Sequence, residues 1–373
     1  MRIERFRVRR TDDFGPRVAE IRTDKGEFKT PSRAATSTEY NYKKNLKIVE
    51  PFENSVGEYV ARFNSDDIKR FGSRNGSYSS RLRTASSYTD TMKYVISKAY
   101  PQYPFEYNFS DEVIRLILDV QVESGLDMVS IPHSAGQLRN LSRHYNRWAS
   151  YVERCAETHG RKVVAVPHVP MKLPEETFQS TIRSLWDEKS RFPVIGLIYG
   201  SITANKINYS FLRSHNDKDV WLHMSAVERI SHAAAGPIAQ MHLPQIYGID
   251  TVSAGIPWGG GGGPPPSYRK LRYYDRPTLS LPRIEDWIRS HRREDSGCGC
   301  PICQGHSFDR IVRDFIAQRT QAIDLTPLFG VFRLHEVFQS TEELEQGQRY
   351  ISENAFAQYL GHRIGSALDE HRD

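Results

Sequence analysis

The chain has 373 residues but only four cysteines, three of which fall between positions 298 and 303. The fourth, Cys155, lies in a helical pattern that predicts a small buried hydrophobic residue. Thiols gathered in this way make no disulfide framework, which suits a reducing compartment. No apolar run approaches transmembrane length, and the start, Met1 to Arg5, is not typical of a signal peptide. We therefore expect a soluble, cytoplasmic protein without a membrane partner.

Segments typical of strands and helices alternate from about residue 111 onward. Short runs rich in β-branched residues predict strands, and amphipathic periodicity predicts helices. The predicted strands are 127–133, 162–169, 193–201, 219–225 and 248–253, and the predicted helices are 111–124, 138–159, 174–189, 205–214 and 227–235. Such alternation predicts right-handed βαβ units and a buried parallel sheet. The number of units favours a closed (β/α)₈ TIM-type barrel.

An open, doubly wound sheet is the alternative fold. That fold would need a phosphate-binding glycine fingerprint after a first strand, and the sequence has none. The run Gly259–Gly263, followed by Pro264–Pro266, lacks the strand-to-helix context and predicts an extended loop.

Chemistry in a parallel barrel gathers where the strands end. Polar residues recur at the ends of the predicted strands: His133, His168, Tyr199 with Gly200 and Ser201, His223 with Ser225, and Asp250 with Ser253. Any single histidine of this set could be a satisfied structural residue. Their recurrence in successive units favours a site that hydrogen-bonds a heterocycle.

Positive charge is clustered, although the formal net charge is only +6. Three segments carry it: residues 1–10, with five arginines, 268–276, with four basic residues, and 289–293, with three. Aromatic residues are interspersed (Tyr268, Tyr273, Tyr274 and Trp287), as on faces that bind nucleic acid. Solvated basic surface is the simpler interpretation, and the aromatic residues favour nucleic acid.

The most specific pattern is Cys298-Gly-Cys300-Pro-Ile-Cys303, followed by His335 in a predicted helix. Three thiolates and one imidazole form a closed tetrahedral zinc site, typical of structural zinc. The glycine and proline between the thiols let the backbone fold tightly around one ion.

With this pattern in place, the chain resembles the tRNA-guanine transglycosylase superfamily. The resemblance implies one (β/α)₈ barrel domain over residues 1–373, with an inserted C-terminal zinc-binding subdomain over 268–345. It implies zinc ligands at Cys298, Cys300, Cys303 and His335. The gap before the histidine is longer than in the common pattern, so His306 is a rival ligand. The segment 332–336 resembles the family's histidine-bearing helix and favours His335.

Four further segments resemble family motifs in the same order. Residues 26–31 resemble an early hairpin, and residues 88–91 resemble a segment whose aspartate is the general acid/base. Residues 196–201 resemble a base-recognition segment, and residues 248–253 resemble the segment that carries the nucleophile. The resemblance implies substrate contacts from His133, His168, Tyr199, Gly200, Ser201 and Ser253.

The departures from the family favour its DNA-modifying branch, the DpdA-type DNA 7-deazaguanine transglycosylases. Tyr199 replaces a base-recognising glutamine, His133 replaces an aspartate, and Ser253 stands where the nucleophile segment has its second aspartate. The resemblance then implies replacement of guanine in DNA by a 7-deazaguanine such as 7-cyano-7-deazaguanine. DNA, the free base and other proteins of a DNA-modification system are the partners it implies.

Base exchange needs a carboxylate that attacks the sugar and an acid that protonates the leaving base. We predict Asp250 as nucleophile and Asp90 as general acid/base. Strict alignment of the motif puts Ser253 in the place of the nucleophile, and a serine forms such an intermediate poorly. Asp90 could equally be a helix N-cap. Two other functions stay open: a tRNA-guanine transglycosylase, and a non-catalytic family member that binds nucleic acid.

Overall fold

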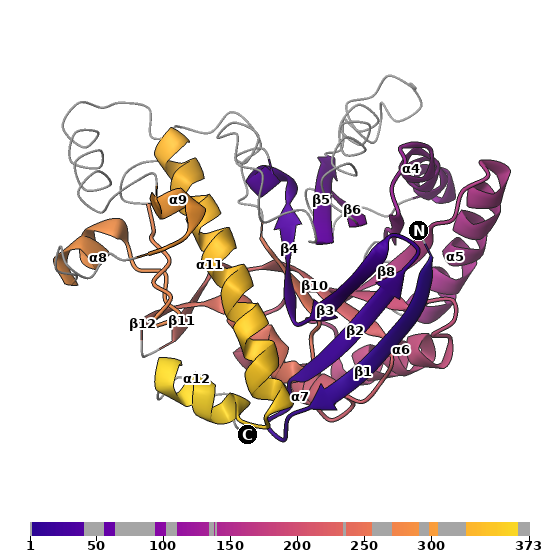
Figure 1. The fold of residues 1–373 in the computed structure, drawn as a ribbon. Helices are drawn as coiled ribbons and strands as arrows, with labels where there is room; N and C mark the ends of the chain where they lie inside the picture. Colours follow the sequence, from indigo (N-terminus) through magenta and orange to yellow (C-terminus); the bar gives the residue numbers. More distant parts are fainter. Residues whose placement is uncertain are drawn as a thin grey trace.

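The computed structural model describes residues 2–40, 56–63, 94–101, 110–133, 138, 140–233, 236–255, 271–290, 298–304 and 326–364. A closed barrel of eight parallel strands forms its centre (Figure 1). The order around the barrel is β10-β13-β4-β5-β6-β7-β8-β9. The strands are β4 (Ser32–Thr36), β5 (Val56–Phe63), β6 (Tyr94–Pro101), β7 (Met128–Ile131), β8 (Val164–Pro170), β9 (Val194–Ile198), β10 (Trp221–Val227) and β13 (Thr251–Ala254).

Helices follow four consecutive strands of the barrel, β6 to β9. They are α4 (Asp111–Glu123), α5 (Leu141–Thr158), α6 (Glu175–Asp187) and α7 (Lys206–Arg213). All four were predicted from sequence to within a few residues. The α/β class, the parallel sheet and the βαβ units over residues 94–227 are therefore confirmed. Much of the chain between β4 and β6 lies outside the described residues, so the full eightfold alternation of strand and helix is not shown.

The segment after β10 differs from its prediction. A helix was expected over 227–235, but this part of the chain forms the antiparallel hairpin of β11 (Ile230–Ala233) and β12 (Gly236–Ala239). Ala233 has high helix propensity, and strand pairing overrides it. The short helices η3 (Gln240–His242) and η4 (Pro244–Tyr247) then lead back to the barrel.

The last barrel strand begins later than predicted. A strand was expected over 248–253, but β13 begins at Thr251. Gly248 ends η4 with a positive φ of 74°, so the chain turns there before it extends. Asp250 consequently precedes the strand, and it lies at the end where the parallel strands begin.

The α-helices around the barrel are specified locally. The hydroxyl Oγ of Ser110 accepts the N–H of Val113 at 3.3 Å, and Asp111 and Glu112 occupy the first turn of α4. Both features stabilise a helix N-terminus. On the buried side of α4 to α6, Ile117, Trp148 and Leu185 pack in one hydrophobic core.

A three-stranded antiparallel sheet covers the end of the barrel where the parallel strands begin. It consists of β1 (Ile3–Thr11), β2 (Arg17–Thr23) and β3 (Gly26–Thr30), and so contains the predicted hairpin (Figure 1). Its Phe28 meets the Trp221 ring edge-on at 5.4 Å. Apolar residues near the starts of the barrel strands complete this layer: Ala34, Val56, Met128, Val164, Val166 and Val194.

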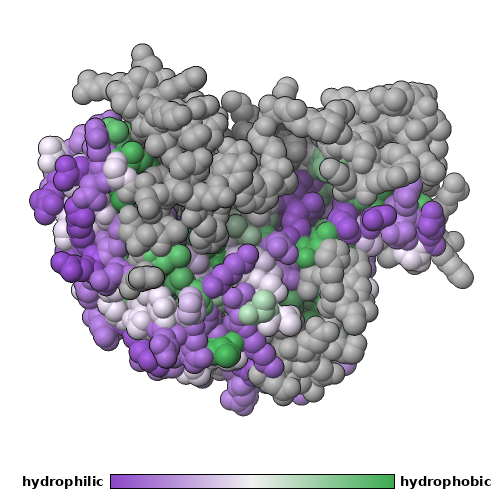
Figure 2. Space-filling model, turned by 180° about the vertical axis from the view of Figure 1, so that it is seen from behind, coloured by the Kyte–Doolittle hydropathy of each residue, from purple (hydrophilic) through white to green (hydrophobic). Residues whose placement is uncertain are grey.

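The C-terminal part contains α8 (Ile284–Ser290), α9 (Pro301–Gln304), α11 (Thr326–Ser352) and α12 (Phe356–Ile364). The long helix α11 packs against β4 and the three-stranded sheet (Figure 1). Ion pairs join it to the barrel: Arg33 of β4 pairs with Glu336 of α11 at 3.9 Å, and Glu39, which follows β4, pairs with Arg333 of α11 at 3.0 Å. On the coloured part of the face in Figure 2, hydrophobic residues gather only in small groups among hydrophilic ones.

Candidate functional site

The structure brings together three of the predicted metal ligands. Cys298, Cys300 and His335 each offer a ligand atom, and these atoms lie within 4.8 Å of one another. The two sulfur atoms are 3.7 and 3.4 Å from Nδ1 of His335. Nε2 of His335 lies 2.9 Å from the Tyr274 carbonyl oxygen, which can only accept, so Nε2 carries the proton. Nδ1 is thereby left with its lone pair directed at the thiols, as metal binding requires.

The remaining ligand candidates are not settled by the structure. The side chain of Cys303 and the whole of His306 lie outside the described residues. The described part is therefore a cluster of two cysteines and one histidine, held by α11 and by the segment before α9. Soft sulfur and imidazole donors suit zinc, and the cluster fits that ion chemically.

Aromatic side chains pack around this cluster. The Tyr273 ring stacks on His335 with centroids 4.3 Å apart, and on its other side it lies 4.1 Å from the Trp287 ring. Tyr273, Tyr274 and Trp287 are at most 5% exposed. They were predicted to be part of a nucleic-acid face, and their burial contradicts that role for these three rings: Tyr273 and Trp287 pack beside the cluster, and Tyr274 packs on His242.

Two of the basic residues near the cluster are also engaged internally. Arg276 pairs with Glu342 and Glu343 of α11, both at 2.6 Å, and Arg272 donates to the Leu281 carbonyl at 2.7 Å. The exposed arginines of the described residues include Arg5, Arg7 and Arg10 on β1. Among the described residues of the three basic segments, those of the first therefore carry the most positive charge available to an anionic partner.

Asp250, the predicted nucleophile, is bound on all sides at the start of β13. Arg17 donates to both carboxylate oxygens, at 3.0 and 2.5 Å, Thr30 donates at 3.1 Å, and the Leu222 N–H donates at 2.7 Å. The side chain is 0% exposed. Burial raises the pKa of this carboxyl, and Arg17 opposes the shift.

This environment does not suit a nucleophile. A carboxylate whose lone pairs are taken by four donors is poorly placed to attack, and it lies at the opposite end of its strand from the usual site of chemistry in a barrel. The expectation that Asp250 lies at a strand's carboxyl end is corrected by the later start of β13. Its position indicates a structural ion pair between the barrel and β2.

A layer of polar residues lies inside the barrel, above the apolar layer. Ser253 of β13 donates to Oε2 of Glu58 on β5, and Nε2 of His223 on β10 lies 3.1 Å from the same oxygen. Strands β13 and β4 stand between β10 and β5, so His223 and Glu58 meet across the interior. All three side chains are at most 1% exposed.

The protons in this layer follow from the chain of hydrogen bonds. The Trp221 indole N–H donates to Oγ1 of Thr251 at 2.7 Å, and that hydroxyl lies 2.8 Å from Nδ1 of His223. With the threonine hydroxyl donating to Nδ1, Nε2 of His223 carries a proton and donates it to Glu58.

His168 and His133 lie on the neighbouring side of the barrel. Nε2 of His168 is 2.8 Å from the Ser130 hydroxyl, and the ring packs directly on Gly196, where a Cβ atom would lie 2.3 Å from Nδ1. His133 follows β7, and its Nδ1 is 3.3 Å from the Tyr145 hydroxyl, which donates to the His168 carbonyl at 2.5 Å. The two predicted histidines therefore share one tyrosine partner.

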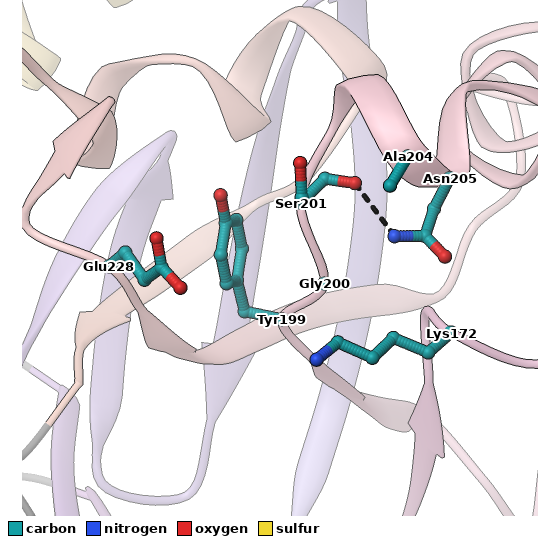
Figure 3. A pocket seen from close by; sticks show the side chains of 7 residues that line it. All are labelled: Lys172, Tyr199, Gly200, Ser201, Ala204, Asn205 and Glu228. Atoms are coloured by element: carbon teal, nitrogen blue, oxygen red, sulfur yellow. Dashed lines mark hydrogen bonds between the residues drawn. The ribbon is translucent and has the colours of Figure 1, made fainter. Parts of the chain in front are cut away.

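The predicted base-binding segment lines a cavity of about 390 Å³ at the carboxyl ends of β8, β9 and β10 (Figure 3). Its lining residues are Lys172, Tyr199, Gly200, Ser201, Ala204, Asn205 and Glu228. Figure 3 shows the Tyr199 ring between the Glu228 carboxylate and the Ser201 side of the cavity. Burial, and to a lesser degree the charge of Glu228, raises the pKa of the Tyr199 phenol.

The loop that carries Tyr199 is held in place by its backbone. The N–H of Tyr199 donates to the Ser225 carbonyl at 3.0 Å, and Tyr209 donates to the Gly200 carbonyl at 2.9 Å. The Asn205 side chain donates to the Ser201 carbonyl at 2.7 Å (Figure 3). A Cβ atom on residue 200 would lie 2.9 Å from both Asn205 and Lys172, so glycine allows this close approach. The cavity is therefore preorganised.

Three functional candidates were missed by the sequence analysis: Glu58, Lys172 and Glu228. The run Val56-Gly-Glu-Tyr-Val alternates as a strand does, which could have indicated Glu58 as an inward-facing carboxylate. Asp90, the predicted acid/base, lies outside the described residues. Cys155 was predicted to be buried, and it is only partly buried; burial and the neighbouring Asp119 raise its pKa to about 12.

Comparison with known proteins assigns no family: no family model matches the chain, and no curated sequence matches it. The resemblance to transglycosylases thus depends on the sequence motifs alone. Within the described residues, no helix combines the length and apolar character needed to cross a membrane.

Proposed function

We propose that this protein is a base-exchange transglycosylase that replaces guanine in DNA with a 7-deazaguanine through a covalent carboxylate–sugar intermediate. The observation that carries the proposal is the cavity at the carboxyl ends of β8 to β10, because an aromatic ring beside a carboxylate and an ammonium suits a purine-like base. Tyr199 would stack on the base. Glu228 would accept from the N1–H and the amino group that guanine and many 7-deazaguanines share.

The C-terminal cluster supports the same proposal. We propose that it holds one structural zinc ion through Cys298, Cys300, Cys303 and His335, with the zinc subdomain predicted over 268–345. The zinc would fix α8, α9 and α11 relative to the barrel and take no part in the reaction. We also propose that the closed parallel barrel is a complete TIM-type (β/α)₈ barrel.

A non-catalytic nucleic-acid-binding protein is the second candidate. The burial of Asp250 in a saturated ion pair favours it, since the expected nucleophile is then missing. Under this proposal the cavity would hold a flipped-out base without exchanging it, and the β1 arginines would add affinity through phosphate contacts.

Exchange of labelled guanine decides between these functions. Purified protein is incubated with duplex DNA or with tRNA that contains labelled guanine, together with unlabelled 7-cyano-7-deazaguanine. Release of label from DNA supports the proposal, and faster release from tRNA moves the activity to that polymer. Tight binding of either polymer with no release supports the non-catalytic function.

The cavity provides a variant for the same assay. Glu228→Gln keeps the shape of the side chain but replaces one acceptor oxygen by an amide donor, which faces the donors of the base. We expect weaker binding of 7-cyano-7-deazaguanine, and a matched control, Glu176→Gln on the exposed side of α6, should bind normally. Equal affinity in both variants would contradict the assignment of the cavity.

A further inference from the structure

We infer that Glu58 is the catalytic carboxylate of this barrel, in place of Asp250. This inference rests on the proposed function and adds to it the identity of the nucleophile. Its basis is the position of Glu58 in the polar layer, where it accepts from Ser253 and lies 3.1 Å from Nε2 of His223.

The location of Glu58 in the barrel is the first argument. Its strand neighbour Val56 belongs to the apolar layer at the closed end, and Glu58 lies two residues further along, so it points inward above that layer. His223, its partner, occupies the same level on β10 as Gly196 on β9. Two residues beyond His223, the Ser225 carbonyl accepts the Tyr199 N–H, so strand β10 connects the polar layer to the loop that lines the proposed base cavity.

The partners of Glu58 are the second argument. Ser253 and His223 both lie within hydrogen-bond distance of one oxygen of the carboxylate and orient its plane. Asp250 in contrast faces a guanidinium that neutralises it. A carboxylate that is held in one orientation before the reaction is preorganised to stabilise a cationic, oxocarbenium-like sugar.

The exclusion of water is the third argument. Glu58 is 1% exposed, and the layer below it is apolar. A glycosyl ester formed at this point would be shielded from hydrolysis until the second base arrives.

The proposed step balances as follows. One oxygen of the Glu58 carboxylate forms a bond to C1′ of the target nucleotide while the C1′–N9 bond breaks. The electron pair of that bond passes to the departing guanine, which takes up a proton from solvent water once it has moved away from Glu58. The incoming 7-deazaguanine loses its N9 proton to water and attacks C1′ with its nitrogen, and the Glu58 carboxylate is released unchanged.

Mapping the covalent adduct tests the inference on the unaltered protein. The full-length enzyme is mixed with DNA without the incoming base, denatured in acid, digested, and examined by tandem mass spectrometry. We expect the sugar on the peptide that contains Glu58. An adduct on Asp250 or Asp90 would overturn the inference and leave the proposed exchange activity standing.

A pair of variants provides the second measurement. Glu58→Gln keeps the side-chain volume, and we expect it to lower the exchange rate by on the order of 10⁴-fold and to abolish the adduct. Asp250→Asn should keep both, when rates are normalised to folded protein. A Glu58→Gln enzyme with normal exchange and adduct would refute the role of Glu58. A wild type with neither exchange nor adduct on DNA and tRNA would instead remove the proposed function, and the inference with it.

Discussion

Two buried carboxylates, Asp250 and Glu58, lie at different levels of the barrel, and their surroundings differ. Asp250 lies at the start of β13, where Arg17, Thr30 and the Leu222 N–H donate four hydrogen bonds to it. Glu58 lies inside the barrel at the level of Ser253, and its donors include a serine hydroxyl and an imidazole. Both side chains are hidden from solvent, so burial alone does not distinguish them.

The difference separates a structural carboxylate from one suited to reaction. A buried charge that is matched by a cation and several donors stabilises one conformation, and removing either partner leaves the other uncompensated. A buried carboxylate that a serine hydroxyl and an imidazole orient is preorganised to stabilise a cationic transition state. The motif order pointed to Asp250, and the geometry points to Glu58.

Loss of the proposed zinc is expected to have the largest effect on stability, because the cluster is proposed to have a structural role. Cys298→Ser and His335→Ala should lose the bound zinc, whose apparent binding free energy in zinc-finger peptides is about 10–16 kcal/mol. Elemental analysis should give one zinc in wild type and in Cys155→Ser, and close to none in the ligand variants. Loss of zinc from His306→Ala, with His335→Ala unaffected, would identify the rival histidine as the ligand.

Substitution of Asp250 should have the second-largest effect on stability. Asp250→Ala leaves Arg17 buried without its counter-ion, and we expect a loss of about 3–5 kcal/mol in the free energy of unfolding, measured with urea. Asp111→Ala, in an exposed pair with Arg147, should cost at most about 1 kcal/mol. If Asp250→Ala is as stable as wild type but inactive, the comparison fails and Asp250 returns as the nucleophile.

A methyl group at position 196 should have an intermediate effect. Gly196→Ala would push against the His168 ring, and overpacking of this kind costs about 1–3 kcal/mol. Gly347→Ala, within α11, is the matched control. Its Cβ would meet Gln245 and Phe356 at ordinary contact distances of 3.5 and 3.6 Å, so the substitution should be neutral or stabilising. Equal unfolding midpoints for the two variants would show that the polar layer is more loosely packed than described.

The smallest change in stability is expected for Glu58→Gln. The amide keeps one acceptor oxygen for Ser253 or His223, so the free energy of unfolding should change by less than about 1 kcal/mol. Urea denaturation of this variant beside Asp250→Asn gives the contrast directly. A loss as large as that of Asp250→Ala would make Glu58 a second structural carboxylate.

The sequence predicted those features that depend on local periodicity and spacing. The helices α4 to α7, the parallel strands β7 to β10 and the grouping of Cys298, Cys300 and His335 are confirmed. The hairpin after β10 and the late start of β13 were not predicted, because strand pairing and a left-handed Gly248 decide them. Glu58 was missed since its partners on β10 and β13 are more than 160 residues away along the chain.

The hydrogen bond between Ser253 and Glu58 also bears on how a site of this kind can drift during evolution. Inward-facing positions on one level of a closed barrel are neighbours whatever their order in the chain, so an acidic group can be supplied from any of the strands. A search that demands an acid in one fixed segment passes over a protein in which a distant strand provides it. A search that compares inward-facing residues at the same level of the barrel, whatever their strand, would find such proteins.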